Sequence, residues 1–314
     1  MHKHLNRRST LGLLGVAGLA ACTGQGGPTL RVGNQRGSTK AMVVAAGVLK
    51  DLAYTIEWSE FPAAQPLLEA IGAGAVDVGL VGDAPFQFAY QSGSPIRAVA
   101  AQRAPDPVRD ALAVVVPRTS AAQNLADLRD GLVATTRGSV GHFLVLRALQ
   151  RAGLPADFVR FSFLTPGDAK AAFSSGAVAA WATWLPYLTA ALAEGARSIV
   201  DGENLVRGYG FEVANIAAIA SRRALLRDFL AREAKALAWA AAHVDDYAVV
   251  LARETRLPLP VARTMAVKNR RLSVPIDGGV IADQNDVFAT FAAAGEVRGR
   301  RQLAQGFERG LVVA

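Results

Sequence analysis

Short apolar segments alternate with longer segments of helical character from Thr29 onward, and this alternation limits the possible folds more than any other feature of the sequence. Strands separated by helices of about 10–15 residues pair in parallel, because the helix carries the chain back to the end of the sheet where the previous strand began. Helices then cover both faces of the sheet. The alternation therefore predicts an α/β protein with a largely parallel sheet.

Two such units follow one another, and a helical segment ends the chain. In the first unit, strands are expected at residues 30–32, 54–58, 76–81, 96–101 and 112–116, and helices at 38–52, 63–72 and 85–91. In the second unit, strands are expected at 132–135, 158–163, 179–183 and 198–200, and helices at 124–130, 139–152, 166–175 and 185–194. Residues 215–221 are predicted to form a strand that returns to the first unit, and helices are expected at 224–254, 260–268, 279–294 and 302–309.

The return strand predicts two interleaved lobes joined by two chain crossings, near residues 116–118 and 212–216. Residues 29–117 and 216–314 then form one lobe, and residues 118–215 form the other. In open α/β sheets a ligand binds beyond the carboxyl ends of the strands, and two hinged lobes can close around it. The predicted ligand site is therefore the cleft between the lobes.

The N-terminal segment has the pattern of an export signal. Basic residues precede an apolar, glycine-spaced run that is too short to span a bilayer as a mature helix. A leucine and two alanines stand directly before Cys22, in the order of a bacterial lipoprotein signal, in which that cysteine is acylated. We expect a lipoprotein signal peptide at residues 1–21, lipidation of Cys22 and a flexible tether at 22–28, so that the protein works outside the cytoplasm at a membrane surface. Arg7 and Arg8 leave the twin-arginine and the general export routes both open.

The composition argues against several classes of partner. The formal net charge is +8 and the pI is near 10.0, which favours anions. The arginines are scattered and aromatic residues make up 7%, however, so the sequence lacks the basic stripe with interleaved aromatics that binds nucleic acid. Cys22 is the single cysteine, so no internal disulfide is expected. His142 and His243 have no partners at metal-ligand spacing, and we expect neither a metal nor a cofactor.

Two loops that connect a strand to a helix carry the features of an anion site. In the first loop, Asn34 and Gln35 precede Gly37 and a predicted helix cap, Ser38. Glycine lets the backbone approach a ligand, and a helix start offers unpaired N–H groups. The loop is not a Walker A motif, because its lysine follows the Ser-Thr pair. A tight turn without a ligand is the alternative interpretation.

The second loop occupies the same place in the second unit and contains Gly138, Ser139, Val140 and His142, with Ser139 as the predicted cap. The two helix starts, one from each lobe, are predicted to converge on the cleft. Each helix dipole stabilises a nearby negative charge by about 0.3–1 kcal/mol. We therefore expect an anionic head group as the ligand.

Two further positions each have two interpretations. Asp83, followed by Ala84 and Pro85, either caps a helix or bonds hydroxyl or amine groups of the ligand. Trp184, at the end of a predicted strand, either packs in the core or covers an apolar ligand tail. Nucleophilic catalysis has little support, because the serine of the second loop is not in a G-x-S-x-G motif.

A set of short motifs, in this order and spacing, resembles the aliphatic-sulfonate, taurine and nitrate-type substrate-binding proteins of ABC importers. The motifs are GNQRG at 33–37, EFPA at 60–63, DVG at 77–79, GDAP at 82–85, ADL at 126–128, GSVGH at 138–142, DAKAAF at 168–173 and WATWLP at 181–186. The resemblance implies the two-lobed type II periplasmic-binding-protein fold, with two hinge crossings and a helical C-terminal segment. It also implies ligand contacts from Gln35, Ala84, Pro85, Gly138, Ser139, His142 and Trp184.

The resemblance further implies a function. The chain is expected to be a monomeric binding protein, not an enzyme, that captures a small organic oxyanion for the transmembrane subunits of an ABC importer. Leu185 stands where an acid is common in the family, which should make the pocket less polar. Two alternatives stay open: the same fold binding a neutral heterocycle, such as a pyrimidine or thiamine precursor, and an extracytoplasmic ester hydrolase.

Overall fold

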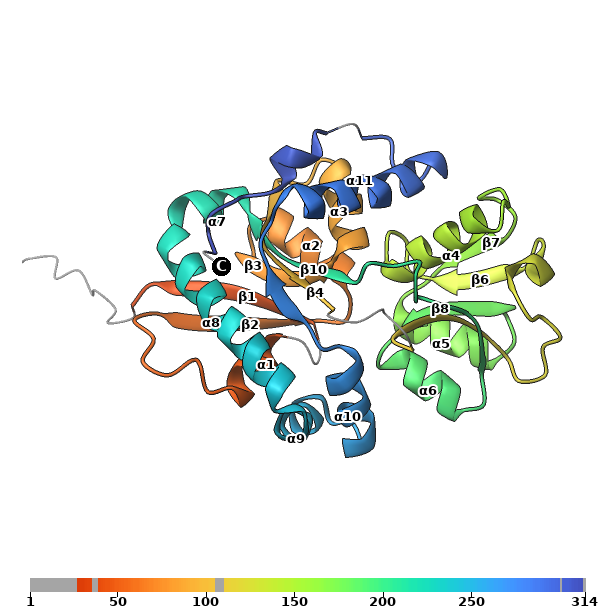
Figure 1. Cartoon of the computed structure of the whole chain (residues 1–314), viewed down its shortest axis with the longest axis horizontal. Coiled ribbons are helices and arrows are strands. Elements are labelled where there is room, and N and C mark those ends of the chain that lie inside the picture. The colour runs from red at the N-terminus through yellow and green to blue at the C-terminus, as the bar shows by residue number, and fades with distance from the viewer. Residues whose placement is uncertain (1–26, 36–38, 105–109, 300, 313–314) are drawn as a thin grey trace, which may run out of the picture.

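Two mixed β-sheets divide the chain into two lobes, as Figure 1 shows. The computed structural model describes residues 27–35, 39–104, 110–299 and 301–312. One sheet has six strands in the order β11-β4-β10-β3-β1-β2, and the other has five in the order β7-β6-β8-β5-β9. We call the two parts the six-stranded lobe and the five-stranded lobe. The predicted two-lobed α/β fold class is confirmed.

The six-stranded sheet is parallel except at two strands. Its members are β1 (Thr29–Gln35), β2 (Thr55–Phe61), β3 (Val78–Gly82), β4 (Ile96–Arg103), β10 (Tyr209–Asn215) and β11 (Leu272–Val274). Strand β1 pairs in parallel with β2 and β3, whereas β10 lies antiparallel between β3 and β4. Strand β11 is a short antiparallel edge strand that the sequence pattern did not predict.

Helices cover both faces of this sheet (Figure 1). On one face lie α2 (Ala64–Gly72), α3 (Asp83–Gln91) and α11 (Gly278–Ala293). Against the other face lie α1 (Thr39–Ala45) and α8 (Arg223–Ala242). Helix α9 (Val244–Thr255) packs on α1, and α10 (Leu259–Lys268) packs on α9. The short helices α7 (Ile216–Ser221) and η2 (Leu303–Gly306) complete the lobe. Among the described residues, no helix combines the length and the apolar character that crossing a membrane requires.

The five-stranded lobe repeats this arrangement on a smaller scale. Its strands are β5 (Leu112–Val116), β6 (Leu132–Thr135), β7 (Arg160–Phe163), β8 (Ala180–Trp184) and β9 (Arg197–Asp201). Its helices are η1 (Leu125–Leu128), α4 (Val140–Arg151), α5 (Pro166–Ser174) and α6 (Tyr187–Ala193). Helix α4 packs on one face of the sheet, and α5 and α6 pack on the other.

The strand that follows each chain crossing is inserted antiparallel in the middle of its new sheet. Strand β5 lies between β8 and β9, and β10 lies between β3 and β4. The crossings therefore lie between Arg103 and Leu112 and between Asp201 and Tyr209, earlier than the positions 116–118 and 212–216 expected from the sequence. Each lobe is thus a mixed sheet, and the expectation of a largely parallel sheet was incomplete.

Several predicted elements differ from the observed ones. The helix expected at 224–254 is divided into α8 and α9 at His243, and the helices expected at 124–130 and 302–309 are the short 3-10 helices η1 and η2. Residues 216–221 form helix α7, not the return strand, because the Asn215 side chain accepts a hydrogen bond from the Ala217 backbone N–H and starts a helix there. Helix α1 ends at Ala45, before the predicted end at residue 52, because Gly47 takes a left-handed conformation (φ +64°) that ends the helix. The predicted signal peptide and Cys22 lie outside the described residues.

Candidate functional site

A cavity of about 520 Å³ lies between the two lobes, at the ends of their strands. From the six-stranded lobe it is lined by Gln35 at the end of β1, Gly82 at the end of β3 and Tyr209 at the start of β10. From the five-stranded lobe it is lined by Leu112 at the start of β5 and Trp184 at the end of β8. This is the place where open α/β sheets bind ligands.

The predicted site residues divide into three groups. Six of them line the cavity: Gln35, Asp83, Pro85, Ser139, Val140 and Trp184. Asn34, Ala84, Gly138 and His142 are not in its lining. Gly37 and Ser38 lie outside the described residues.

Asn34 holds the first loop in place from outside the main cavity. Its side-chain amide donates to the Glu60 carboxylate at 2.9 and 3.2 Å, and its oxygen accepts a hydrogen bond from the Lys40 backbone N–H at 3.0 Å. It lines a separate hollow together with Lys40, Glu60 and Glu254. Asn34 therefore fastens the start of α1 to β2.

His142 is fully buried beneath the second loop. Its Nδ1 accepts a hydrogen bond from the Gly138 N–H at 3.2 Å, and its ring packs against Phe161, Phe163 and Phe291 with centroids 4.7–5.4 Å apart. Burial, assisted by the nearby Arg137 charge, lowers the pKa of His142 to about 3. The histidine is therefore a neutral residue that positions the Gly138 backbone from below.

We predict that the imidazole of His142 stays neutral from pH 8 down to about pH 4. The contribution of His142 to the unfolding free energy should fall as the pH drops below about 6.5, because the unfolded chain binds a proton there that the folded chain excludes. Nitrogen chemical shifts of the imidazole measure the protonation state directly, and an His142→Gln variant assigns the signals. A titration midpoint between pH 5 and 7 for His142 would contradict this prediction.

Helix starts from both lobes reach the cavity. Ser139 caps α4 by accepting a hydrogen bond from the His142 backbone N–H, and both Ser139 and Val140 line the cavity. Thr39, the first described residue of α1, lines it from the six-stranded lobe. Helix α3 starts beside α4, since a Cβ placed on Gly82 would lie 3.0 Å from Val140. The expected convergence of helix starts on one cavity is therefore present.

The lobes also touch at the rim of the second loop. The Gln65 side chain, on α2, donates a hydrogen bond to the Arg137 carbonyl, and the Arg137 guanidinium pairs with Glu296. Gly138 has a positive φ of 68°, and a Cβ there would lie 2.6 Å from the Phe88 ring on α3. Only glycine fits this position. Any other residue would strain the backbone at this positive φ, and its Cβ would clash with the Phe88 ring of the neighbouring lobe.

The cavity wall includes cationic residues that the sequence pattern did not single out: Lys170, Arg270 and Arg271. Lys170 pairs with Glu194 at 2.7 Å, and the Arg271 guanidinium donates to the Gly208 carbonyl near the second chain crossing. Burial lowers the pKa of Arg271, and the negative charge of Asp83 opposes that shift. Arg270 and Arg271 are adjacent in the sequence, but the sequence analysis interpreted the arginines as scattered surface residues.

Asp83 is the first residue of α3, and Gly82 is the helix cap, which corrects the predicted capping role of Asp83. Its Oδ1 accepts the Ala84 N–H at 2.8 Å, and its Oδ2 has no hydrogen-bond partner among the described residues. Burial raises the pKa of Asp83 to about 6, and the charge of Arg271 opposes that rise. The carboxyl group is therefore partly protonated near neutral pH.

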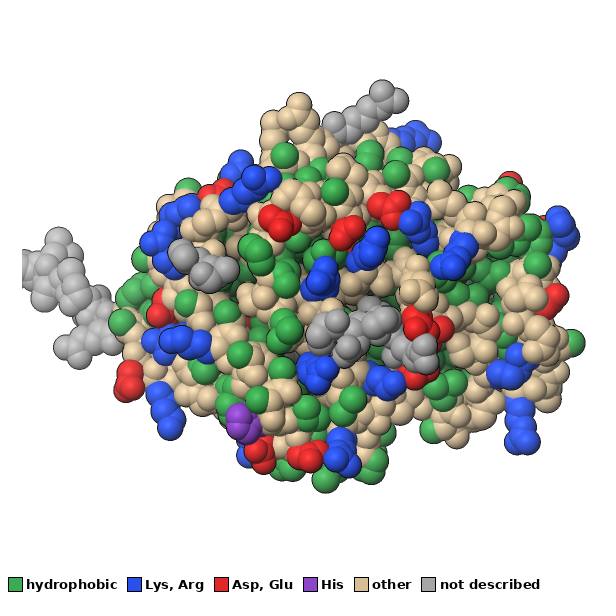
Figure 2. All heavy atoms as spheres, in the orientation of Figure 1, with side chains coloured by type: hydrophobic (Ala, Val, Ile, Leu, Met, Phe, Trp, Pro, Cys, Tyr) green, Lys and Arg blue, Asp and Glu red, His purple; other side chains and the backbone are tan. Residues whose placement is uncertain are grey.

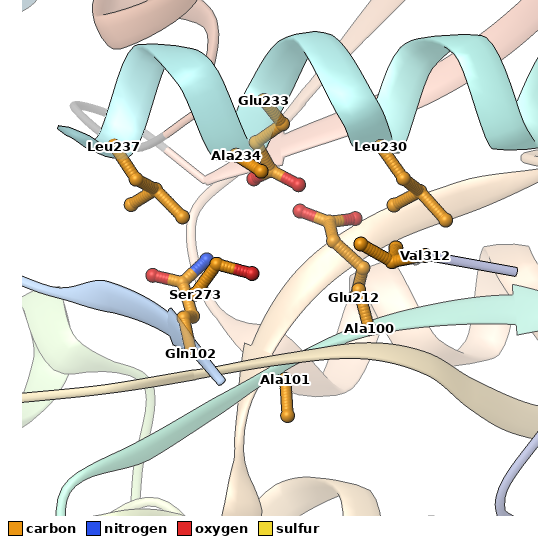
Figure 3. Close-up of a pocket in the computed structure, with 10 residues that line it drawn as sticks. All are labelled: Ala100, Ala101, Gln102, Glu212, Leu230, Glu233, Ala234, Leu237, Ser273 and Val312. Atoms are coloured by element: carbon orange, nitrogen blue, oxygen red, sulfur yellow. The ribbon is translucent and has the colours of Figure 1, made fainter. Parts of the chain in front are cut away.

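Two buried glutamates face each other behind the cavity wall (Figure 3). Glu212 comes from β10 and Glu233 from α8, and both are at most 2% exposed. The Thr39 hydroxyl lies 3.4 Å from Glu212 Oε1 and 3.2 Å from Glu233 Oε1. A hollow of about 10 Å³ beside the pair has the room of one water molecule.

The two carboxyl groups cannot both carry a charge in this apolar setting. Burial raises the pKa of Glu233 to about 7. Burial and repulsion from Glu233 raise the pKa of Glu212 well above its usual range. The pair therefore retains at least one proton at neutral pH, and Thr39 connects it to the cavity wall.

We predict that this pair makes the protein less stable as the pH rises. Unfolded glutamates lose their protons near pH 4.3, so the stabilisation is complete below that pH and is lost as the pH rises through 7. Glu233→Gln should flatten this slope and raise the unfolding free energy at pH 8 by roughly 2–3 kcal/mol. Urea unfolding between pH 5 and 9 measures the slope. Glu69→Gln, on the exposed face of α2, is the matched control, and equal slopes for both variants would contradict the prediction.

Charges on the visible surface are mixed. In Figure 2, Lys and Arg side chains spread over both lobes, and several lie beside Asp or Glu. Ion pairs on the described surface include Arg97–Glu308 at 2.8 Å and Arg263–Asp245 at 2.7 Å. Within the described ranges, no group of three or more His, Cys, Asp or Glu side chains is placed to hold a metal ion.

Comparison of the whole chain with known proteins identifies its family. A relative from Escherichia coli strain K12, named as an aliphatic sulfonates-binding protein, is 34% identical to this chain over 263 residues. The match covers 82% of this chain and 82% of that relative. The chain belongs to the family of aliphatic sulfonate-binding proteins. No family model matches the sequence.

Two solved structures of this family superpose well on the chain. The periplasmic aliphatic sulphonate binding protein SsuA from Escherichia coli has a TM-score of 0.79 and 30% identity, and the match covers 91% of this chain and 94% of that one. The alkanesulfonate-binding protein SsuA from Xanthomonas axonopodis pv. citri, bound to MOPS, has a TM-score of 0.82 and 29% identity, and covers 91% and 99%. The predicted family and the periplasmic-binding-protein fold are thus confirmed.

Proposed function

We propose that this protein captures an organosulfonate outside the cytoplasm, in the cavity between its lobes, and delivers it to an ABC importer while a lipid on Cys22 holds it at the membrane. The single observation that carries the proposal is the cavity itself: it lies between two lobes, receives a helix start from each, and occurs in a chain of the aliphatic sulfonate-binding family. The named relatives bind sulfonates, and one of them was solved with MOPS, a sulfonate, bound.

The cavity chemistry supports an anionic head group. Helix α4 begins after the Ser139 cap, and Ser139 and Val140 line the cavity, so the positive end of the helix dipole lies beside it. Lys170, Arg270 and Arg271 add positive charge to its wall. The acids that approach the cavity, Asp83 and the Glu212–Glu233 pair, are buried and their pKa values are raised, which reduces the negative charge that would repel an anion.

Binding is tested by calorimetry with methanesulfonate, ethanesulfonate, taurine, nitrate and a sulfate ester. We expect heat of binding with at least one sulfonate and weaker or no binding of nitrate. A folded sample that binds none of these anions would overturn the proposal. Co-purification of a neutral heterocycle, identified by mass spectrometry, would favour the alternative cargo instead.

Ser139→Asp should weaken sulfonate binding by about 100-fold or more. A carboxylate here still caps α4 but places a negative charge at the head group, and two like charges about 4 Å apart repel by about 4 kcal/mol at an intermediate dielectric constant. Ser139→Asn is the matched control, because asparagine has the same shape, caps a helix equally well and carries no charge. Calorimetry compares the two variants. Equal affinities for Asp and Asn would show that the anion does not lie at this helix start.

Cys22→Ser should move the protein from the membrane fraction to the soluble extracytoplasmic fraction. Because Cys22 is the only cysteine, incorporation of a labelled fatty acid reports on this residue alone. Mass spectrometry of the purified wild type should show a diacylglyceryl-modified Cys22 as the first residue. A wild-type protein that keeps residues 1–21, or that carries no lipid, would contradict the anchoring part of the proposal.

A further inference from the structure

One wall of the cavity has an unusual composition. The chain has three methionines, and the two that follow Met1 both line this cavity: Met42 on α1 and Met265 on α10. Both are buried, with 6% and 3% of their surface exposed. Methionine is flexible and polarisable, and proteins use it at surfaces that adapt to ligands of different shape. The placement of both internal methionines on one wall therefore points to a binding role.

Small and aromatic residues complete this wall. Ala240 and Ala241 on α8 and Ala266 on α10 leave room beside the methionines. Tyr247 on α9 reaches the same cavity, and burial raises its pKa to about 12, so its hydroxyl stays neutral. We call Met42, Ala240, Ala241, Tyr247, Met265 and Ala266 the methionine subsite.

The opposite lobe faces this wall with aromatic rings. Trp184 and Tyr187 line the cavity from the five-stranded lobe and meet edge to face, with ring centroids 6.3 Å apart. Leu185 and Pro186 continue this apolar surface. Apolar and aromatic groups thus line both sides of one part of the cavity, while Ser139 and Asp83 lie at the starts of α4 and α3.

The elements separate the two parts of the cavity. The methionine subsite comes from α1, α8, α9 and α10, which lie on one side of the six-stranded sheet, whereas α3 lies on the other side, next to α4 (Figure 1). A cavity of about 520 Å³ falls within the range of pockets that hold drug-sized ligands. A sulfonate group with one or two carbons leaves most of that volume without a contact.

We infer that the methionine subsite binds the apolar tail of a bulky organosulfonate, an aromatic ring or an alkyl chain of about six carbons or more. This inference rests on the proposed function and specifies its ligand class. The tail lies between the two methionines and the Trp184–Tyr187 pair, and the sulfonate lies at the Ser139 side of the cavity. Each buried methylene group raises affinity by about fourfold, and sulfur–aromatic contacts favour rings.

The first test compares tails of different size by calorimetry on the purified protein. Naphthalene-2-sulfonate and hexanesulfonate should each bind at least about 30-fold more tightly than methanesulfonate, since several methylene equivalents become buried. Equal affinity for all three would overturn the inference but leave the proposed function intact. Failure of all three to bind would overturn the proposed function as well.

The second test locates the tail. With methyl-labelled methionine, residues 42 and 265 report individually on the wall, and Met265→Leu assigns the signals. Naphthalene-2-sulfonate should shift both methyl resonances through its ring current, and methanesulfonate should leave them nearly unchanged. Tight naphthalene-2-sulfonate binding without a shift at either methionine would place the tail elsewhere and refute the subsite.

The third test fills the subsite. Ala241→Phe should weaken naphthalene-2-sulfonate at least about tenfold while methanesulfonate affinity stays within about twofold. Ala242→Phe is the matched control, because its neighbour Ala242 is exposed and outside the cavity lining. Thermal unfolding confirms that both variants are folded. If Ala241→Phe weakens both ligands equally, or neither, the tail does not lie at this wall.

Discussion

The insertion of β10 into the six-stranded sheet is the constraint on which the rest of the structure depends. Every residue of Tyr209–Asn215 is buried, and the strand pairs antiparallel with both β3 and β4. Because it enters from the other lobe, its first residues, Tyr209 and Gly210, lie at the edge where the parallel strands end, and both line the cavity. The strand that follows the second chain crossing thus lies inside the sheet and also forms part of the site.

Local sequence signals predicted those parts of the site that depend on strand-to-helix turns. Ser139 was expected to cap a helix and does so. Gln35 was expected in the loop after the first strand and Trp184 at a strand end, and both line the cavity at the ends of β1 and β8. Whether these residues touch a ligand remains a prediction. His142 shows the limit of such reasoning, because the first turn of a helix exposes one side and buries the other. Three positions after the cap, this side chain turns inward to a phenylalanine cluster.

The remaining parts of the site depend on tertiary packing that no local pattern encodes. Helical spacing places Glu233 on the same face of α8 as Leu230 and Leu237, but that spacing does not show what the face meets in the fold. Only the approach of β10 brings it opposite Glu212. Similarly, Met265 belongs to α10, which the sequence indicated only as one of several C-terminal helices. This helix forms part of the cavity wall because it packs on α9, which in turn packs on α1. Residues far apart in sequence meet there through two successive helix contacts.

Burial of acids and attraction of an anion are compatible here for one physical reason. A carboxylate in a cavity wall would repel an anionic ligand, and removing it from water would cost several kcal/mol if it stayed charged. Burial instead favours the protonated form, so the buried Glu212 and Glu233 carry less of the charge that would oppose an anion. Burial lowers the pKa of Arg271 as well, and the negative charge of Asp83 opposes that shift. The same desolvation that raises the pKa values of the acids therefore weakens their opposition to an anion, while Arg270 and Arg271 remain in the cavity wall.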